Sequence, residues 1–263
     1  MRTNHVRAKL KRGEPSVGTW LVLADPLAAR MMATTGFDWL TVDLEHGGTT
    51  LETAAEIFAL LAGNGPAPLV RVPVNSVENI KRVLDSGAWG VVVPMVNSRA
   101  EAEAVVAAAR YAPIGQRSIG GQMPAINFAC DSATYFAKAN DEILVVVMAE
   151  HVRAIEAIDD ILSVPGIDAV FIGPNDLHHS LGKKPAFESD DPAFVNAVGR
   201  VLASAKKHGI AAGIHVADAA AAKRRIAEGF QFIAIASEAR FMTAKAAEIT
   251  ASLGLGGKTA VNY

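Results

Sequence analysis

One stretch of the chain limits the possible folds more than any other, because two strand-length apolar runs flank a helical repeat. Ile143–Ala149 and Ile167–Ile172 are apolar runs of the kind expected for parallel strands covered on both faces. Between them, residues 151–162 place apolar side chains at helical spacing. The stretch therefore predicts a βαβ unit, with Glu150 after the first strand and Asp176 after the second, at one edge of a parallel sheet.

The same alternation runs along the whole chain and predicts a (β/α)8 TIM barrel, a single domain over residues 1–263 with an extra basic helix at residues 2–12. The alternative is an open doubly wound sheet, but LVLADP follows the first strand where a glycine-rich dinucleotide fingerprint would stand. The other expected strands are Ser16–Leu23, Trp39–Leu44, Pro68–Val72, Trp89–Met95, Ile210–Ile214 and Phe230–Ala236.

Composition limits the partners and the location. The 263 residues carry a formal net charge of -2 without a basic cluster, which argues against nucleic acid as a partner. The apolar runs are only strand-length, and the first residues lack the hydrophobic region of a signal peptide, so we expect no membrane partner and a cytoplasmic location. Cys130 is the only cysteine, which excludes an intrachain disulfide.

Chemically useful side chains gather at one end of the expected barrel. In this fold, function belongs at the carboxyl ends of the strands. Those ends carry an arginine, an imidazole and several carboxylates, whereas the opposite ends carry mostly glycine, proline and small residues, and this asymmetry predicts an enzyme. In chain order the residues are Trp20, Asp43 to His46, Arg71, Pro94-Met95, Glu150, Asn175-Asp176, His215 and Ser237.

Each of four residues can be given a chemical role. Glu150 and Asp176 form an oxygen-rich site for a divalent metal ion such as Mg2+, Mn2+ or Co2+. A 2-oxo acid could chelate this ion through its keto and carboxylate oxygens, so that the metal stabilises an enolate. Arg71 would stabilise negative charge on the keto oxygen, and His46 would act as the base, because imidazole titrates near neutral pH.

The same residues also have structural explanations. Either acid alone could be a solvated loop residue or a helix N-cap. Arg71 could form a structural ion pair, and His46 could be a hydrogen-bonded loop histidine. The remaining histidines near the two central strands are expected to be exposed: His151, His178 and His179.

Two absences narrow the chemistry. None of the eleven lysines lies on an expected strand or at its carboxyl end, so Schiff-base catalysis is not expected. The loops after the seventh and eighth strands, HVAD and ASEA, contain no glycine to form the usual phosphate cradle. We therefore expect an unphosphorylated substrate and a metal-dependent reaction.

Over nearly its full length the chain resembles the class II, metal-dependent pyruvate aldolases, typified by 4-hydroxy-2-oxoheptanedioate aldolase and the 2-keto-3-deoxy sugar-acid aldolases. Taken together, the matching motifs are specific to this family. They are GTWL at Gly18–Leu21, GFDWLTVDLEHG at Gly36–Gly47, VRVP at Val70–Pro73, VPMV at Val93–Val96, RYAPIGQRSIGG at Arg110–Gly121, GIDAVFIGPNDL at Gly166–Leu177 and the closing Tyr263.

The resemblance implies the same metal ligands, base and arginine as the residue chemistry. It also implies that Asp85 tunes the catalytic histidine, which Asp85 could reach only across a subunit contact. Members of the family are homo-oligomers, typically a hexamer built as a trimer of dimers with a swapped final helix. We therefore expect a hexamer with these features.

Three positions depart from the family pattern. Met148 stands where a substrate-contacting glutamine is usual, and His215 stands where an aliphatic residue is usual. Asn175 replaces a small residue whose backbone N–H meets the pyruvate carboxylate. With Trp20, Arg71 and Asp176, these three residues make up the expected substrate-binding set, and they leave the identity of the substrates open.

The sequence therefore predicts an aldolase that reversibly cleaves 4-hydroxy-2-oxo acids to pyruvate, or hydroxypyruvate, and an aldehyde through a metal-stabilised enolate. An oxaloacetate decarboxylase or an acyl-CoA ester lyase could use the same enolate site. The third alternative is a non-catalytic relative that binds 2-oxo acids.

Overall fold

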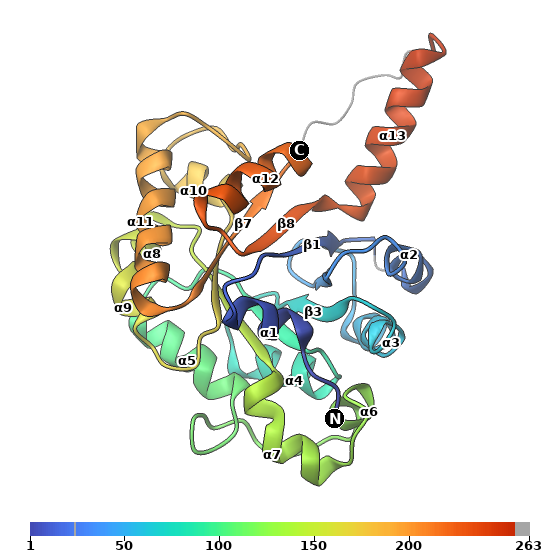
Figure 1. Ribbon diagram of the computed structural model, residues 1–263, viewed down its shortest axis with the longest axis vertical. Helices are drawn as coiled ribbons and strands as arrows, with labels where there is room; N and C mark the ends of the chain where they lie inside the picture. The colour runs from blue at the N-terminus through green and yellow to red at the C-terminus, as the bar shows by residue number, and fades with distance from the viewer. Residues whose placement is uncertain (24, 256–263) are drawn as a thin grey trace.

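Eight parallel strands pair in chain order and close into a barrel in the computed structural model, which describes residues 1–23 and 25–255 (Figure 1). The predicted (β/α)8 barrel is therefore confirmed, and the open sheet is wrong. Tyr263 lies outside the described residues. The strands are β1 Ser16–Leu21, β2 Trp39–Asp43, β3 Ala67–Arg71, β4 Gly90–Val93, β5 Leu144–Met148, β6 Ala169–Ile172, β7 Ala211–Val216 and β8 Phe232–Ser237.

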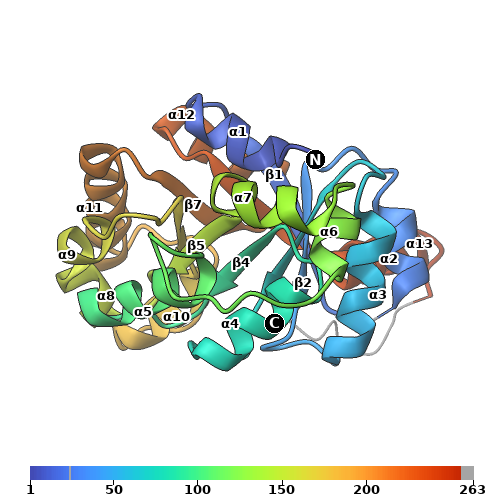
Figure 2. The same cartoon turned by 90° about the horizontal axis from the view of Figure 1, so that it is seen from below.

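Helices surround the strands when the molecule is seen from below (Figure 2). In the part of the chain that the structure describes, no helix is long and apolar enough to cross a membrane. The helices are α1 His5–Lys11, α2 Pro26–Met32, α3 Leu51–Leu61, α4 Val77–Asp85, α5 Arg99–Ala109, α6 Met123–Asn127, α7 Ser132–Glu142, α8 Val152–Glu156, α9 Ile158–Leu162, α10 Pro174–Ser180, α11 Pro192–His208, α12 Ala219–Glu228 and α13 Glu238–Ser252.

Short polar side chains set where many of the helices begin. Asp25 accepts a hydrogen bond from the backbone N–H of Ala28, and Ser76 accepts one from Asn79. Each cap satisfies an N–H group that has no partner within the helix. Each cap therefore fixes the residue at which its helix begins.

Three local expectations differ from the structure. The helix expected over residues 151–162 is divided at Ala157, although no proline or glycine marks that turn. Asp176, for which a solvated loop position or a helix N-cap was the structural alternative, lies inside the first turn of α10, where Gly173 is the N-cap and Pro174 the first residue. His178, expected to be exposed, is buried against Phe194, with the two ring centroids 4.0 Å apart.

The interior of the barrel fixes the relative positions of the strands. Trp39 stacks on Phe232, with centroids 4.3 Å apart, and packs against β1 at Gly18. A Cβ atom on Gly18 would lie 2.1 Å from the Trp39 ring, so this approach of β1 to β2 requires glycine. The packed interior shows that the barrel is filled with side chains and leaves function to its rim.

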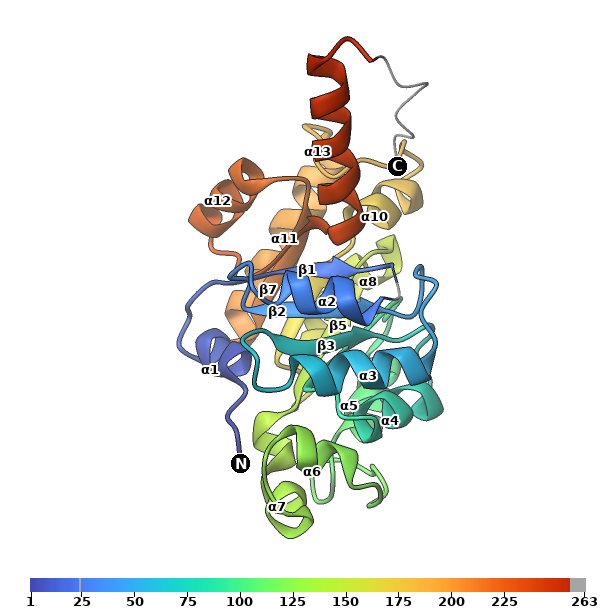
Figure 3. The same ribbon diagram turned by 90° about the vertical axis from the view of Figure 1, so that its right-hand side faces the viewer.

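The last helix leaves the barrel instead of covering it (Figures 1 and 3). Only Glu238 is buried in α13, whereas Met242 and Ile249 are 58% and 49% exposed. Swapping of this helix between subunits stays a prediction.

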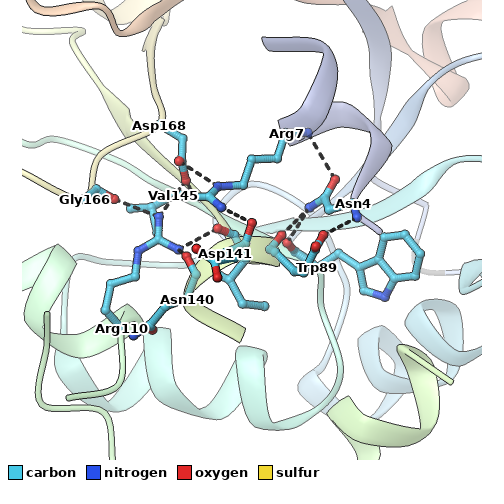
Figure 4. Close-up of polar contacts among 11 residues, drawn as sticks. Asn4, Arg7, Trp89, Arg110, Asn140, Asp141, Val145, Gly166 and Asp168 are labelled. Carbon is cyan, nitrogen blue, oxygen red and sulfur yellow. Dashed lines mark hydrogen bonds and ion pairs between the residues drawn. The ribbon is translucent and has the colours of Figure 1, made fainter. Parts of the chain in front are cut away.

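A buried ionic cluster closes the opposite, amino-terminal face of the barrel (Figure 4). Asp168 accepts from Arg7 Nε at 2.8 Å and from Arg110 Nη2 at 2.6 Å, and its Oδ2 also accepts from the Val145 N–H. The Arg110 side chain is 1% exposed and also donates to the Ile143 carbonyl. One carboxylate therefore joins α1, the end of α5, β5 and the start of β6.

We expect Asp168→Asn to destabilise the fold, because it leaves two buried guanidinium groups without their counter-charge. Removing one partner of a buried ion pair costs about 3–5 kcal/mol in free energy of unfolding. Urea unfolding followed by circular dichroism measures this loss. As a control, Asp159→Asn changes an exposed acid that pairs with Lys207, and it should have little effect. Equal effects of the two substitutions would contradict the role of Asp168.

Candidate active site

Arg71 is the best-held charged group at the carboxyl end of the barrel. Its Nε donates to Asp43 Oδ1 at 2.9 Å and its Nη2 to Asp43 Oδ2 at 2.6 Å, while Nη1 lies 3.2 Å from Glu45 Oε2. The guanidinium also lies over the Trp20 ring, 4.5 Å from its centroid. Arg71 is therefore in the ion pair considered from the sequence, and its side chain stays 11% exposed at the rim.

Asp43 shapes the loop that follows β2. Its Oδ1 accepts hydrogen bonds from the backbone N–H groups of Glu45 and His46, at 3.0 and 3.2 Å. Burial opposes ionisation of Asp43, but the hydrogen bond and the charge of Arg71 outweigh it and lower its pKa. The sequence placed Asp43 and Glu45 at a strand end but did not predict that they pair with Arg71. The only sign of this pairing was that both acids directly precede His46, at one and three positions before it.

Glu150 is a buried carboxylate whose burial outweighs the groups that stabilise its charge. It is 3% exposed, and its Oε1 accepts from the Met95 N–H at 2.8 Å. Burial raises the pKa of Glu150 to about 7; the charges of Asp176 and Glu45 add to the rise, while the Met95 hydrogen bond and the positive charge of Arg71 oppose it. Gly173 makes room for this carboxylate, because a Cβ there would lie 2.4 Å from Glu150 Oε2.

Asp176 stands near Glu150 as the βαβ pattern predicted. It is exposed in the first turn of α10, and its charge raises the pKa of both Glu150 and Glu45. Among residues 1–23 and 25–255, no group of three His, Cys, Asp or Glu side chains is placed to hold a metal ion by itself. Two hard oxygen donors in an acidic setting fit a divalent cation that takes its other ligands from substrate and water.

His46 and Asp85 are far less enclosed. The His46 side chain is 64% exposed, and its Nε2 lies 3.9 Å from Glu45 Oε2. Asp85 ends α4 and accepts from the buried Arg117 Nη2 at 2.7 Å. Among the contacts of the described residues none joins His46 to Asp85, so one chain does not bring this expected pair together.

The remaining members of the expected substrate-binding set lie at different depths. Trp20 and Met148 are buried, at 3% and 2% exposed, and Trp20 lies against the Arg71 guanidinium. Asn175 is half-buried at the start of α10. His215 is half-buried at the end of β7, where its Nε2 lies 3.0 Å from the Ala236 carbonyl oxygen.

The structure adds Phe187 to this part of the site. Its ring meets the His215 ring edge-on, with the two centroids 4.9 Å apart. The Arg240 guanidinium lies over the Phe187 ring, 5.2 Å from its centroid. Phe187 lies in the loop between α10 and α11. No periodicity indicates that such a loop folds back over β7, so only the structure identifies Phe187.

We expect Glu150→Gln to stabilise the metal-free protein at pH 8. Glu150 ionises near pH 4.5 when unfolded and near pH 7 when folded. The folded state therefore binds an extra proton between these values, and its stability falls as the pH rises through them. The neutral amide removes this loss, which is about 3 kcal/mol at pH 8.

Thermal and urea unfolding in EDTA at pH 5 and pH 8 measure this effect. The gain should be present at pH 8 and small at pH 5, where the wild-type carboxyl is mostly protonated. A variant that is less stable than the wild type at pH 8 would show that the buried charge of Glu150 is compensated within the protein.

Sequence similarity links the chain to known aldolases. The family model described as HpcH/HpaI aldolase/citrate lyase matches residues 16–244. The chain is 34% identical over 248 residues to a hydroxypyruvate/pyruvate aldolase of Rhizorhabdus wittichii, which covers 94% of this chain and 98% of the relative. It is also 34% identical to a 5-keto-4-deoxy-D-glucarate aldolase of Shigella dysenteriae, over 89% of this chain and 91% of the relative.

Solved structures resemble the whole barrel. An HpcH/HpaI aldolase/citrate lyase family protein from Burkholderia cenocepacia has a TM-score of 0.88 at 30% identity, covering 96% of this chain and 100% of that chain. The citrate lyase β subunit from M. tuberculosis, complexed with oxaloacetate and magnesium, has a TM-score of 0.60 at 16% identity, covering 88% and 95%. At that identity the second likeness concerns the fold alone.

Proposed function

The chain belongs to the HpcH/HpaI aldolase/citrate lyase family, and from this premise we propose how its own residues carry out an aldolase reaction. It is an aldolase of the pyruvate and hydroxypyruvate type, at 34% identity over most of the chain. These relatives favour aldol cleavage over the decarboxylase, the acyl-CoA ester lyase and the non-catalytic alternatives. The reaction joins or separates a small 2-oxo acid and an aldehyde.

The proposed mechanism depends above all on the fixed position of Arg71 near Glu150 and Asp176, two carboxylates whose charges interact. Asp43, Glu45 and the Trp20 ring hold the guanidinium from three directions. Arg71 therefore needs no reorganisation when negative charge develops on the keto oxygen of the substrate. We assign it the stabilisation of the enolate, with the Asn175 backbone N–H meeting the substrate carboxylate as the family resemblance implies.

Glu150 and Asp176 are the residues that would hold the divalent ion. A protein of the same fold, the citrate lyase β subunit, was solved with magnesium. Polarisation of the 2-oxo group is the chemistry that such an ion supplies. Glu150 contributes a carboxylate whose buried charge is poorly compensated by protein groups, and this favours a cation over an empty site.

The proton transfers belong to His46. In the cleavage direction it takes the proton of the substrate 4-hydroxyl, the bond between C3 and C4 breaks, and the aldehyde forms from C4. The bonding electrons move into the enolate, and protonation at C3 then gives pyruvate or hydroxypyruvate. The open position of His46 allows it to reach a substrate that sits on the other charged groups.

We propose that the enzyme is a homo-oligomer, a hexamer arranged as a trimer of dimers, in which Asp85 of one subunit approaches His46 of another. Arg117 fixes one oxygen of Asp85, and the Asp85 side chain stays 24% exposed. The apolar residues exposed on α13 suit a helix that packs on a neighbouring subunit.

We expect Glu150→Ala and Asp176→Ala each to abolish metal-dependent cleavage of 4-hydroxy-2-oxo acids. Loss of either carboxylate removes a ligand that the remaining residues cannot replace. Pyruvate release in a coupled assay measures cleavage, and solvent exchange of the pyruvate methyl protons with Mn2+ measures enolate formation. Full activity of either variant in EDTA would exclude the mechanism.

A complementation experiment tests the contact between subunits. His46→Ala and Asp85→Ala chains are each expected to be impaired, but co-expression should restore activity, because about a quarter of the sites in randomly mixed oligomers combine both native residues. Cleavage rates of the purified mixed oligomers measure this.

The matched control mixes His46→Ala with Glu150→Ala, two residues that the proposal assigns to the same subunit. That mixture should gain nothing, because every site then lacks at least one of them. Recovery in the control, or none in the test mixture, would contradict the proposed arrangement of subunits.

A further inference from the structure

We propose that His215 is a hydrogen-bond acceptor for a substrate hydroxyl, and that it directs this enzyme toward hydroxylated partners in the aldol reaction. The inference rests on the aldolase function proposed above and adds a substrate class to it. It comes from the structure of the rim between β7, β8 and the loop that carries Phe187.

The hydrogen bond of His215 defines which ring nitrogen is protonated. A carbonyl oxygen can only accept, so the Nε2 that lies 3.0 Å from Ala236 O must carry the hydrogen. In the neutral ring, Nδ1 is then a bare acceptor. Among the described residues Nδ1 has no hydrogen-bond partner, and His215 is half-buried near the carboxyl end of β7, on the rim of the barrel.

The His215 ring is neutral near pH 7. Burial lowers the pKa of His215 to about 4, and the positive charges of Arg71 and Arg240 contribute to the lowering. A neutral ring with a committed Nε2 can accept a hydrogen bond from a hydroxyl but cannot donate one to a second carboxylate. The chemistry of His215 therefore selects a hydroxyl group.

The backbone of β8 orients the His215 ring through the Ala236 carbonyl. The register between β1 and β8 shifts by one residue, since Gly18 pairs with Ala234 but Trp20 pairs with Ser237. Ala236, inside this irregularity, has a φ of 45°, a left-handed conformation that is uncommon for alanine. The carbonyl that receives the His215 hydrogen thus belongs to a specially shaped segment beside the site.

Aromatic side chains hold the ring on its other sides. Trp20 and Phe187 have ring centroids 5.8 and 4.9 Å from that of His215. Trp20 also carries Arg71, so the proposed acceptor and the enolate-stabilising cation share one neighbour. Glu188, the residue after Phe187, forms an ion pair with Arg224 of α12 and so attaches this loop to the helix. The His215 ring is therefore held at the rim, with the Trp20 ring between it and the Arg71 guanidinium as a shared neighbour.

The selected hydroxyl could belong to either reaction partner. It is the 3-hydroxyl when hydroxypyruvate replaces pyruvate, and it is the 2-hydroxyl when glycolaldehyde replaces acetaldehyde. Measuring kcat/KM for the four combinations of these compounds, in the direction of synthesis, gives a preference ratio for each partner. The ratio that responds to substitution of His215 identifies the source of the hydroxyl.

His215→Phe keeps a ring for packing but removes the acceptor, and it should lower one of the two preference ratios about tenfold, the effect of one lost hydrogen bond in a partly buried site. His215→Asn retains an oxygen acceptor near the Nδ1 position and should keep that ratio within about threefold of the wild type. His208→Leu, a histidine on α11 beside Asp159, is the control and should leave both ratios unchanged.

Two outcomes would overturn the proposal: wild-type ratios in both arms for His215→Phe, or a fall for His215→Asn as large as that for His215→Phe. The second would show that the ring, rather than the acceptor, is what the substrate requires. Exchange of pyruvate methyl protons by the wild type is a separate test. Its absence would contradict the aldolase mechanism, whereas exchange with unaltered ratios would contradict only the role of His215.

Discussion

The ion pair between Arg71 and Asp43 is the contact on which the carboxyl end of this barrel depends. It joins the last residues of β2 and β3, and the same Asp43 carboxylate also receives the N–H groups of Glu45 and His46. One buried acid therefore sets the direction of the arginine and the path of the loop that carries the histidine. The pairing of β2 with β3 therefore fixes where Arg71 and the loop of His46 lie relative to each other. Such fixed positions suit groups that must contact one substrate.

The charges around this pair do not balance. Asp43 and Arg71 neutralise each other, which leaves Glu45, Glu150 and Asp176 with a shared excess of negative charge. A buried carboxylate with a raised pKa is costly in a folded protein, and such sites persist where a ligand supplies the missing charge. This excess, more than the number of potential ligands, supports the proposed divalent cation at the site. It also accounts for the strong response expected from a single change of Glu150 to an amide.

The features that the sequence predicts and those it does not differ in their physical origin. The barrel and the ends of its strands follow from local periodicity, and in a parallel barrel each strand end has a known side. This was sufficient to place Arg71, Glu150 and Asp176 at one rim. The contacts of Phe187 with His215, and of Asp168 with two arginines, join segments far apart in the chain, which periodicity cannot indicate. The turn at Ala157 likewise has no breaking residue to mark it. The role of Asp85 depends on a subunit contact that one chain does not contain.

The two faces of the barrel use buried charge in opposite ways. At the amino-terminal face, Asp168 meets both of its arginines and a backbone N–H, so the charges and hydrogen bonds there are satisfied within the protein. At the carboxyl face, Glu150 accepts a hydrogen bond from the N–H of Met95. Met95 and Ala236 both have a left-handed backbone conformation, with φ of 54° and 45°. Unbalanced charge and strained backbone thus occur together where substrate would bind, and they require a scaffold that is stable without them. The satisfied face provides that stability, which is why the reactive face can retain groups that lack partners until a ligand arrives.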